Sequence, residues 1–141
     1  MIPISEAIET GTWLQAKNDN VTFRIRVTAF SKIDPANIPP IESKGIDIDS
    51  NIWLLSLDVI NLCKTEQSLD TLKHSLKIMD EEEYEFSAFD SSSLYNNLGL
   101  SQFYSLSLPA KIKKSGALTF ELPEVFEQLF LTINNGEISE V

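Results

Sequence analysis

Apolar and polar residues alternate strictly over residues 21–29, which read Val-Thr-Phe-Arg-Ile-Arg-Val-Thr-Ala. A period of two is typical of a strand that buries one face. Weaker forms of the same alternation recur along the chain, each bounded by turn residues. They predict further strands over residues 52–62, 72–78, 84–88, 104–108, 118–122 and 129–133.

The segments between these strands carry turn and loop signals. Three prolines between Asp34 and Gly45 predict a long surface loop, because proline cannot donate to a sheet ladder. The acidic run Asp80 to Glu83 predicts the turn of a hairpin, and Lys111 to Gly116 a basic turn. Residues 124–128 suit a single helical turn, and Asn134-Asn135-Gly136 ends the last strand. With no long amphipathic helix, the pattern predicts an all-β fold of two packed antiparallel sheets with about seven to eight strands.

The same alternation predicts which residues face the core. We expect residues 1–10 to be a peripheral N-terminal segment, a frayed helical turn or a tail, and residues 11–141 to form a single domain. The side chains expected to point inward are Phe23, Ile25, Val27, Trp53, Leu55, Leu57, Val59, Leu118, Phe120, Leu131 and Ile133.

Composition narrows the classes of partner. The chain has 141 residues, 43% of them hydrophobic, and a formal net charge of −10 from 21 acidic and 11 basic residues. Such a charge repels phosphate backbones and anionic lipid headgroups, so nucleic acid and membrane-surface partners are disfavoured and a basic partner is attracted. A simpler interpretation of the negative charge is that it only keeps the protein soluble.

The sequence shows neither an apolar stretch of membrane-spanning length nor a basic segment followed by an apolar run at its start. As it stands, it predicts a cytoplasmic protein, with a secreted or cell-surface location as the alternative if a leader has been removed. The single cysteine, Cys63, fits either location, since it cannot form an internal disulfide.

Several strand and turn segments of the second half resemble a known family. They are Asp58-Val59-Ile60-Asn61-Leu62, Leu76-Lys77-Ile78-Met79-Asp80 leading to Tyr84, Leu108-Pro109-Ala110 with Lys111 and Gly116, Leu118-Thr119-Phe120-Glu121-Leu122-Pro123, and the strand at residues 129–133. The chain from Val21 to Asn134 thus resembles the bacterial immunoglobulin-like domain of unknown function whose fold is shared with the mycobacterial immunoprotective secreted antigen. The resemblance implies an immunoglobulin-like antiparallel β-sandwich.

That family occurs mostly on secreted proteins and surface lipoproteins, and the resemblance implies no catalytic residue. This chain differs from the family at two places. It lacks the usual leader and lipid-attachment cysteine, and Glu81 to Glu83 stand where the family often has a glycine.

The residue types that carry chemistry do not assemble into a known catalytic or metal motif. His74 is the only histidine, which excludes a zinc site with several imidazoles. Cys63 beside Lys64 is more typical of a small buried residue than of a reactive thiol. Asp47, Asp49, Asn51 and Asp58 lack the glycine that a calcium loop needs at its sixth position, where Ile52 stands. We expect no enzyme activity and no cofactor.

The remaining hypotheses concern binding. The first is a non-enzymatic protein-binding or adaptor module on the sandwich; the alternative is an acidic cytosolic immunity or inhibitor protein that neutralises a basic toxin or nuclease. The acidic turn can also hold a hard cation together with Asp90, although a solvated turn is the simpler interpretation. Loops at the ends of a sandwich usually carry recognition. The candidate partner-binding residues are therefore Asp80, Glu81, Glu82 and Glu83 in the turn and Asp34, Asn37 and Glu42 in the long loop.

Overall fold

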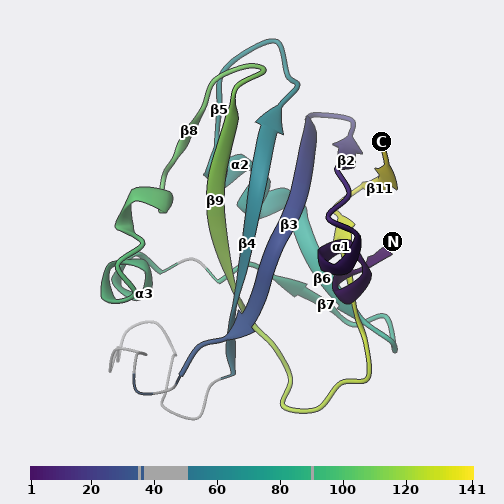
Figure 1. Cartoon of the computed structure of the whole chain (residues 1–141), viewed down its shortest axis with the longest axis vertical. Coiled ribbons are helices and arrows are strands. Elements are labelled where there is room, and N and C mark those ends of the chain that lie inside the picture. Colours follow the sequence, from purple (N-terminus) through teal and green to yellow (C-terminus); the bar gives the residue numbers. More distant parts are fainter. Residues whose placement is uncertain (35, 37–50, 90) are drawn as a thin grey trace.

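The computed structural model describes residues 1–34, 36, 51–89 and 91–141. Its strands form a five-stranded antiparallel sheet in the order β11-β2-β3-β4-β9, a four-stranded one in the order β1-β10-β6-β7, and the short pair β5-β8 (Figure 1). This confirms the predicted immunoglobulin-like all-β sandwich. Among the described residues, eight strands have three or more residues, and six of these eight lie in segments whose alternation predicted a strand.

The five-stranded sheet is built from the longest strands. β3 (Thr22–Lys32) and β4 (Ile52–Asn61) form its centre and pair over nearly their whole length, with a bulge in β3 between Val27 and Ala29. β9 (Lys113–Glu121) pairs with β4, so the predicted basic turn is shorter than expected. On the other side, β2 (Leu14–Asn18) pairs with β3 and with β11 (Gly136–Glu140).

In the four-stranded sheet, β10 (Leu129–Ile133) lies between β6 (Leu76–Asp80) and the two-residue β1 (Ile2–Pro3). β7 (Glu85–Ser87) pairs with β6 and completes the predicted acidic hairpin. The turn after β10 leads into β11, a strand that the sequence analysis missed, and so carries the chain from one sheet to the other.

The core lies between the two sheets and largely matches the prediction. Ten of the eleven side chains expected to point inward are buried, while Trp53 is only half-buried and packs against the edge of this core. A second, smaller cluster of Ile33, Ile52 and Leu94 is separate from the main core.

The N-terminal segment is more firmly attached than expected. Residues Ile4–Thr10 form helix α1, which Gly11 ends in the left-handed conformation that glycine adopts without strain. Ile4 and Ala7 are buried in the main core, and β1 pairs with β10. The segment is therefore part of the sandwich rather than peripheral to it.

Three local predictions were wrong. The first half of the predicted strand at residues 72–78 belongs to helix α2 (Leu69–Ser75), which follows β5 (Gln67–Ser68). The predicted strand at residues 104–108 reduces to β8 (Ser107–Leu108), because the chain before it forms helix α3 (Ser92–Asn97) and the 3-10 turn η2 (Ser101–Phe103). Residues 124–128 contain no helical turn.

Candidate binding surface

The acidic turn between β6 and β7 presents three of its four predicted residues to solvent. Glu81, Glu82 and Glu83 are exposed, whereas Asp80 is buried. The Asp80 carboxylate accepts hydrogen bonds from the backbone amides of Glu82 and Tyr84, at 3.0 and 2.9 Å. Asp80 therefore shapes the turn from within, and its inclusion among the partner-binding residues does not fit the structure.

Asp34, the described one of the three residues predicted in the long loop, does not join the turn. Asp34 is exposed where the chain leaves β3, and its carboxylate accepts a bond of 3.0 Å from the amide of Ala36. This end of β3 and the β6–β7 turn lie well apart in Figure 1. Asn37 and Glu42 lie outside the described residues.

The turn instead contacts the connection between β9 and β10. The Glu81 carboxylate accepts a hydrogen bond from the backbone amide of Glu127. Glu81 and Glu82 then line a hollow together with Val125, Phe126 and Glu127. Val125 is 84% exposed and Tyr84, in the turn, 64%. Exposed apolar and acidic side chains thus lie together in what we call the acidic hollow, defined by Glu81, Glu82, Val125, Phe126 and Glu127.

An aromatic pocket of about 360 Å³ adjoins this hollow, and the two share Phe126 and Glu127. The rings of Phe30 and Trp53 stack with centroids 4.8 Å apart, and Phe126 meets Trp53 edge-on at 5.8 Å. The aromatic pocket is lined by Ile4, Ser5, Ile8, Phe30, Trp53, Phe126, Glu127, Gln128 and Leu129. It is therefore mainly apolar, with a carboxylate among its lining residues.

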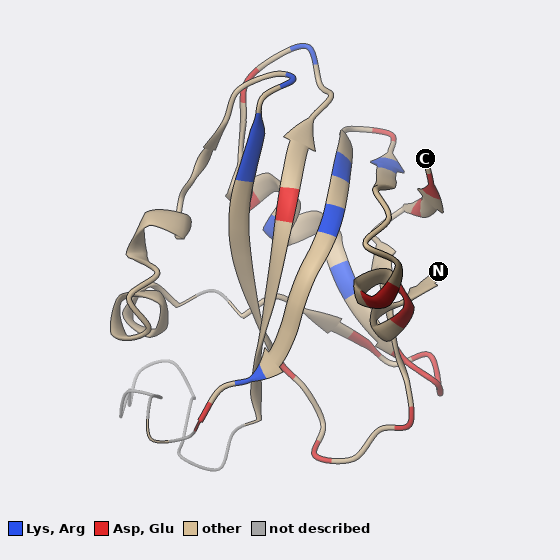
Figure 2. Ribbon diagram, in the orientation of Figure 1, with Lys and Arg blue, Asp and Glu red and all other residues tan. Residues whose placement is uncertain are grey.

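Charge is distributed unevenly over the molecule (Figure 2). Acidic residues follow the β6–β7 turn and the connection from β9 to β10, whereas basic residues occur on β3 and at the start of β9. On the five-stranded sheet, Arg26 binds Asp58 with N···O distances of 2.7 and 3.2 Å and lies over the ring of Trp13. Ser115 donates to the other oxygen of Asp58 at 2.9 Å.

Burial alone would raise the pKa of Asp58, yet the hydrogen bonds from Arg26 and Ser115 and the charges of Arg26 and Lys113 outweigh it, so the pKa lies below its ordinary value of 3.8. The neighbouring cations keep the Asp58 carboxylate ionised, and the carboxylate balances their positive charge. This cluster therefore stabilises the face of the sheet.

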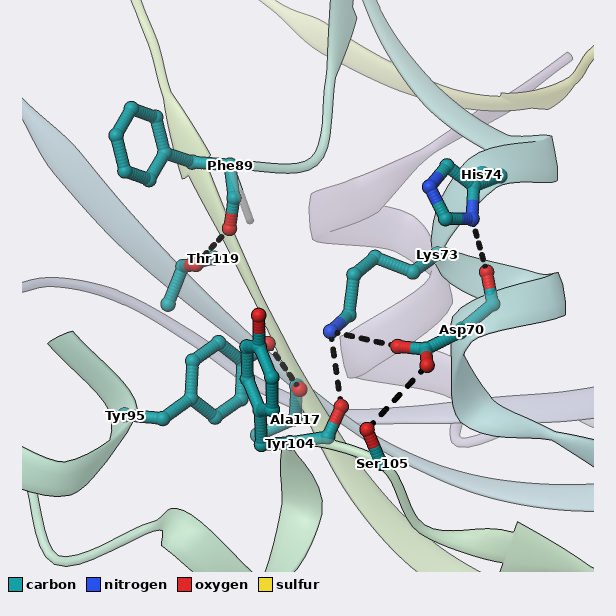
Figure 3. A network of polar contacts seen from close by, with 9 residues as sticks. All are labelled: Asp70, Lys73, His74, Phe89, Tyr95, Tyr104, Ser105, Ala117 and Thr119. Atoms are coloured by element: carbon teal, nitrogen blue, oxygen red, sulfur yellow. Dashed lines mark hydrogen bonds and ion pairs between the residues drawn. The ribbon is translucent and has the colours of Figure 1, made fainter. Parts of the chain in front are cut away.

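A buried cation lies beside helix α2 (Figure 3). The ammonium of Lys73, with a side chain only 1% exposed, contacts Asp70 at 3.1 Å and the carbonyl oxygen of Tyr104 at 3.0 Å. It also lies over the rings of Tyr95 and Tyr104, 5.1 and 4.5 Å from their centroids. The Tyr95 hydroxyl donates to the carbonyl oxygen of Ala117 at 2.8 Å. The cluster was not predicted from the sequence, because in the strand expected over residues 72–78 the polar Lys73 would lie on the outer face.

The other residues considered for chemistry make local contacts. His74 is exposed, with its Nδ1 atom 2.7 Å from the carbonyl oxygen of Asp70. Cys63 is half-buried and packs against the main core. The part of the chain that the structure describes contains no group of three or more His, Cys, Asp and Glu side chains arranged to hold a metal ion. Its helices include none long and apolar enough to cross a membrane.

No family model and no curated protein matches this chain. Solved structures are similar at the level of the fold. The secreted protein MPT63 from Mycobacterium tuberculosis has 11% sequence identity and a TM-score of 0.54, over 93% of both chains. A conserved hypothetical protein from Bacillus anthracis has 14% identity and a TM-score of 0.53, over 90% of this chain and 94% of its own.

The candidate lipoprotein YcdA from Bacillus subtilis also has 14% identity and a TM-score of 0.53. The alignment covers 89% of this chain but only 37% of YcdA. At such low identity these likenesses establish a shared fold with secreted and lipoprotein-type β-sandwich proteins and leave the activity open.

Proposed function

We propose that this protein is a non-enzymatic binding module, which recognises a protein partner through the acidic hollow and the neighbouring turn. The observation that carries the proposal is the contact between the turn and the β9–β10 connection, made by Glu81 and the amide of Glu127. It places the exposed carboxylates of Glu81 and Glu82 next to Val125. Exposed apolar side chains bordered by one sign of charge are typical of a protein interface.

The sign of the charge indicates a basic partner. Three consecutive exposed carboxylates on one turn attract cations, and a net charge of −10 adds a long-range field. Opposite charges at an interface mainly raise the association rate, and salt screens this effect.

The proteins of similar fold suggest a cellular location for this protein. MPT63 is a secreted protein and YcdA a candidate lipoprotein, which favours a secreted or cell-surface location over the cytoplasm. Membership of the bacterial immunoglobulin-like domain family is part of the same proposal. Fractionation of native cells, with detection of the protein in culture medium, envelope and cytoplasm, tests the location.

The partner is tested by pull-down from native cells, followed by binding kinetics at two ionic strengths. Replacing Glu81, Glu82 and Glu83 by Gln should slow association and flatten its salt dependence. The matched control removes three exposed carboxylates elsewhere, with Asp19→Asn, Glu137→Gln and Glu140→Gln. Equal kinetics for the two triple variants would remove the turn from the interface. A captured toxin or nuclease that loses activity on binding would instead identify an inhibitor.

A further inference from the structure

The aromatic pocket and the acidic hollow meet at Phe126 and Glu127, and this juxtaposition indicates what kind of partner segment fits. We propose that the aromatic pocket receives one apolar side chain of a partner peptide, while Lys or Arg residues flanking that side chain bind the carboxylates beside the pocket. The inference rests on the proposed function and specifies its partner.

The walls of the aromatic pocket come from α1, β3, β4, β10 and the connection between β9 and β10. Ile4 and Ile8 lie on α1, Phe30 on β3 and Trp53 on β4, and Phe126 belongs to the β9–β10 connection. Ile4 is buried, and Ile8, Phe30, Trp53 and Phe126 pack against the main core. The floor is thus held by the core rather than by an isolated loop, which favours a pocket that is formed before its ligand binds.

The pocket is large enough to hold a side chain. A volume of about 360 Å³ lies at the lower end of the range of roughly 300 to 1,000 Å³ that is typical of ligand pockets. Stacked and edge-on rings offer a large apolar area that an aromatic or aliphatic group can cover. A single Phe, Leu or Met side chain that anchors a longer segment fits this description.

The charge around the pocket selects against anionic ligands. Glu127 is among the lining residues, none of which is Lys or Arg, and Glu81 and Glu82 line the adjoining hollow. A fatty acid would bring its carboxylate toward these groups, with no Lys or Arg among the lining residues to receive it. A peptide with Lys or Arg on either side of the anchor would place positive charge next to exposed carboxylates.

Trp53 supplies a direct signal for occupancy. The chain contains two tryptophans, and Trp13 lies under Arg26 on the five-stranded sheet, outside the pocket lining. In a Trp13→Phe background, the fluorescence of Trp53 therefore reports on the pocket alone. Three blocked peptides are titrated to millimolar concentration: Lys-Lys-Phe-Lys-Lys, Lys-Lys-Ala-Lys-Lys and Glu-Glu-Phe-Glu-Glu.

The first peptide should change the emission of Trp53 and bind about tenfold more tightly than either of the others. Phe126→Ala should weaken it about tenfold, whereas Phe130→Ala, which changes a half-buried phenylalanine outside the pocket lining, should not. Ser5→Phe fills the pocket from the exposed face of α1 and should block binding even if Phe126→Ala fails to fold. Circular dichroism checks that each variant is folded.

Equal affinities for the Phe and Ala peptides, or for the Lys and Glu peptides, would overturn the inference. So would the absence of binding by all three, or binding that Ser5→Phe leaves unchanged. None of these outcomes touches the proposed function, which stands or falls with the effect of the Glu81, Glu82 and Glu83 substitutions on the captured native partner.

Discussion

The hydroxyl of Tyr95 donates a hydrogen bond of 2.8 Å to the carbonyl oxygen of Ala117, and so connects helix α3 to the outer edge of β9. Phe89 supports the same edge, since its amide donates to the carbonyl oxygen of Thr119 and its own carbonyl accepts from the Thr119 hydroxyl. An uncovered edge strand offers unpaired backbone groups to other chains. Phe89 and helix α3 therefore protect the β9 edge of the five-stranded sheet.

Tyr95→Phe should lower the free energy of unfolding by about 1 to 3 kcal/mol, because the carbonyl oxygen of Ala117 would be left without its buried donor. Tyr84→Phe, on a side chain that is 64% exposed, should change it by less than about 0.5 kcal/mol. Urea unfolding of both variants makes the comparison. Equal effects would show that the Tyr95 hydroxyl contributes nothing specific.

Lys73→Met should lower the free energy of unfolding by about 1 to 3 kcal/mol, since it removes the buried donor to Asp70 and to the carbonyl oxygen of Tyr104. The penalty is moderate because the Asp70 side chain, 39% exposed, can be hydrated. Lys77→Met removes a solvent-exposed hydrogen bond to Ser87 and serves as the control. A Lys73 variant as stable as this control would contradict the structural role of the cluster.

The stability of the protein should depend on pH through Asp58. Its pKa in the folded state is lowered below 3.8, so the stabilisation by its ion pair is complete above that value. It is lost as the pH falls through the lower, folded-state pKa. The difference in unfolding free energy between the wild type and Asp58→Asn should therefore shrink as the pH falls below 3.8. Denaturant unfolding across the acidic range measures it, and a difference that grows with acidity would refute the sign.

Gly136→Ala should destabilise the attachment of β11 to β2. A Cβ atom at this position would overlap the backbone carbonyl oxygen of Lys17, and it would lie 2.8 Å from the Cα atom of Asn18. Relief of this overlap requires movement of the backbone, which costs about 1 to 3 kcal/mol. Hydrogen exchange should be faster for the β11 amides, whereas Ser139→Ala on the same strand should leave it unaltered.

Folding should not require a metal ion. EDTA should leave the melting temperature unchanged, because the carboxylate of Asp80 is already engaged by backbone amides within the turn. A calcium-dependent rise of several degrees would show instead that Glu81, Glu82 and Glu83 hold a cation.

The strands predicted best from the sequence are those whose apolar residues fit the period of a strand and not also that of a helix. Residues 21–29 alternate without exception and lie in β3 from Thr22 on, and residues 52–61 form β4. Around Leu72 two periodicities compete. Leu72, Leu76 and Ile78 fit a strand, but Leu69, Leu72 and Leu76 also fit the face of a helix, and all four are buried. Burial of Leu69 in the main core satisfies the helical pattern, and the strand begins only at Leu76.

The binding surface was predicted only in part, for a different reason. Exposed carboxylates in a turn can be recognised from local composition, as Glu81 to Glu83 were. The aromatic pocket depends on Phe30, Trp53 and Phe126, which are distant in sequence and meet only after both sheets have packed. One local signal of the aromatic pocket was Phe126, which is an isolated aromatic residue in the acidic connection between β9 and β10.

The placement of the terminal strands has a consequence for biosynthesis. β10 lies inside the four-stranded sheet, between β1 and β6, and β11 closes the five-stranded sheet against β2. Each sheet thus joins the first residues of the chain to residues beyond position 128, and such non-local pairings form late. A nascent chain that has reached β9 has both long central strands but no partner for β1 and none for the free edge of β2. It must be kept from associating through these edges until residues 129–141 have been added.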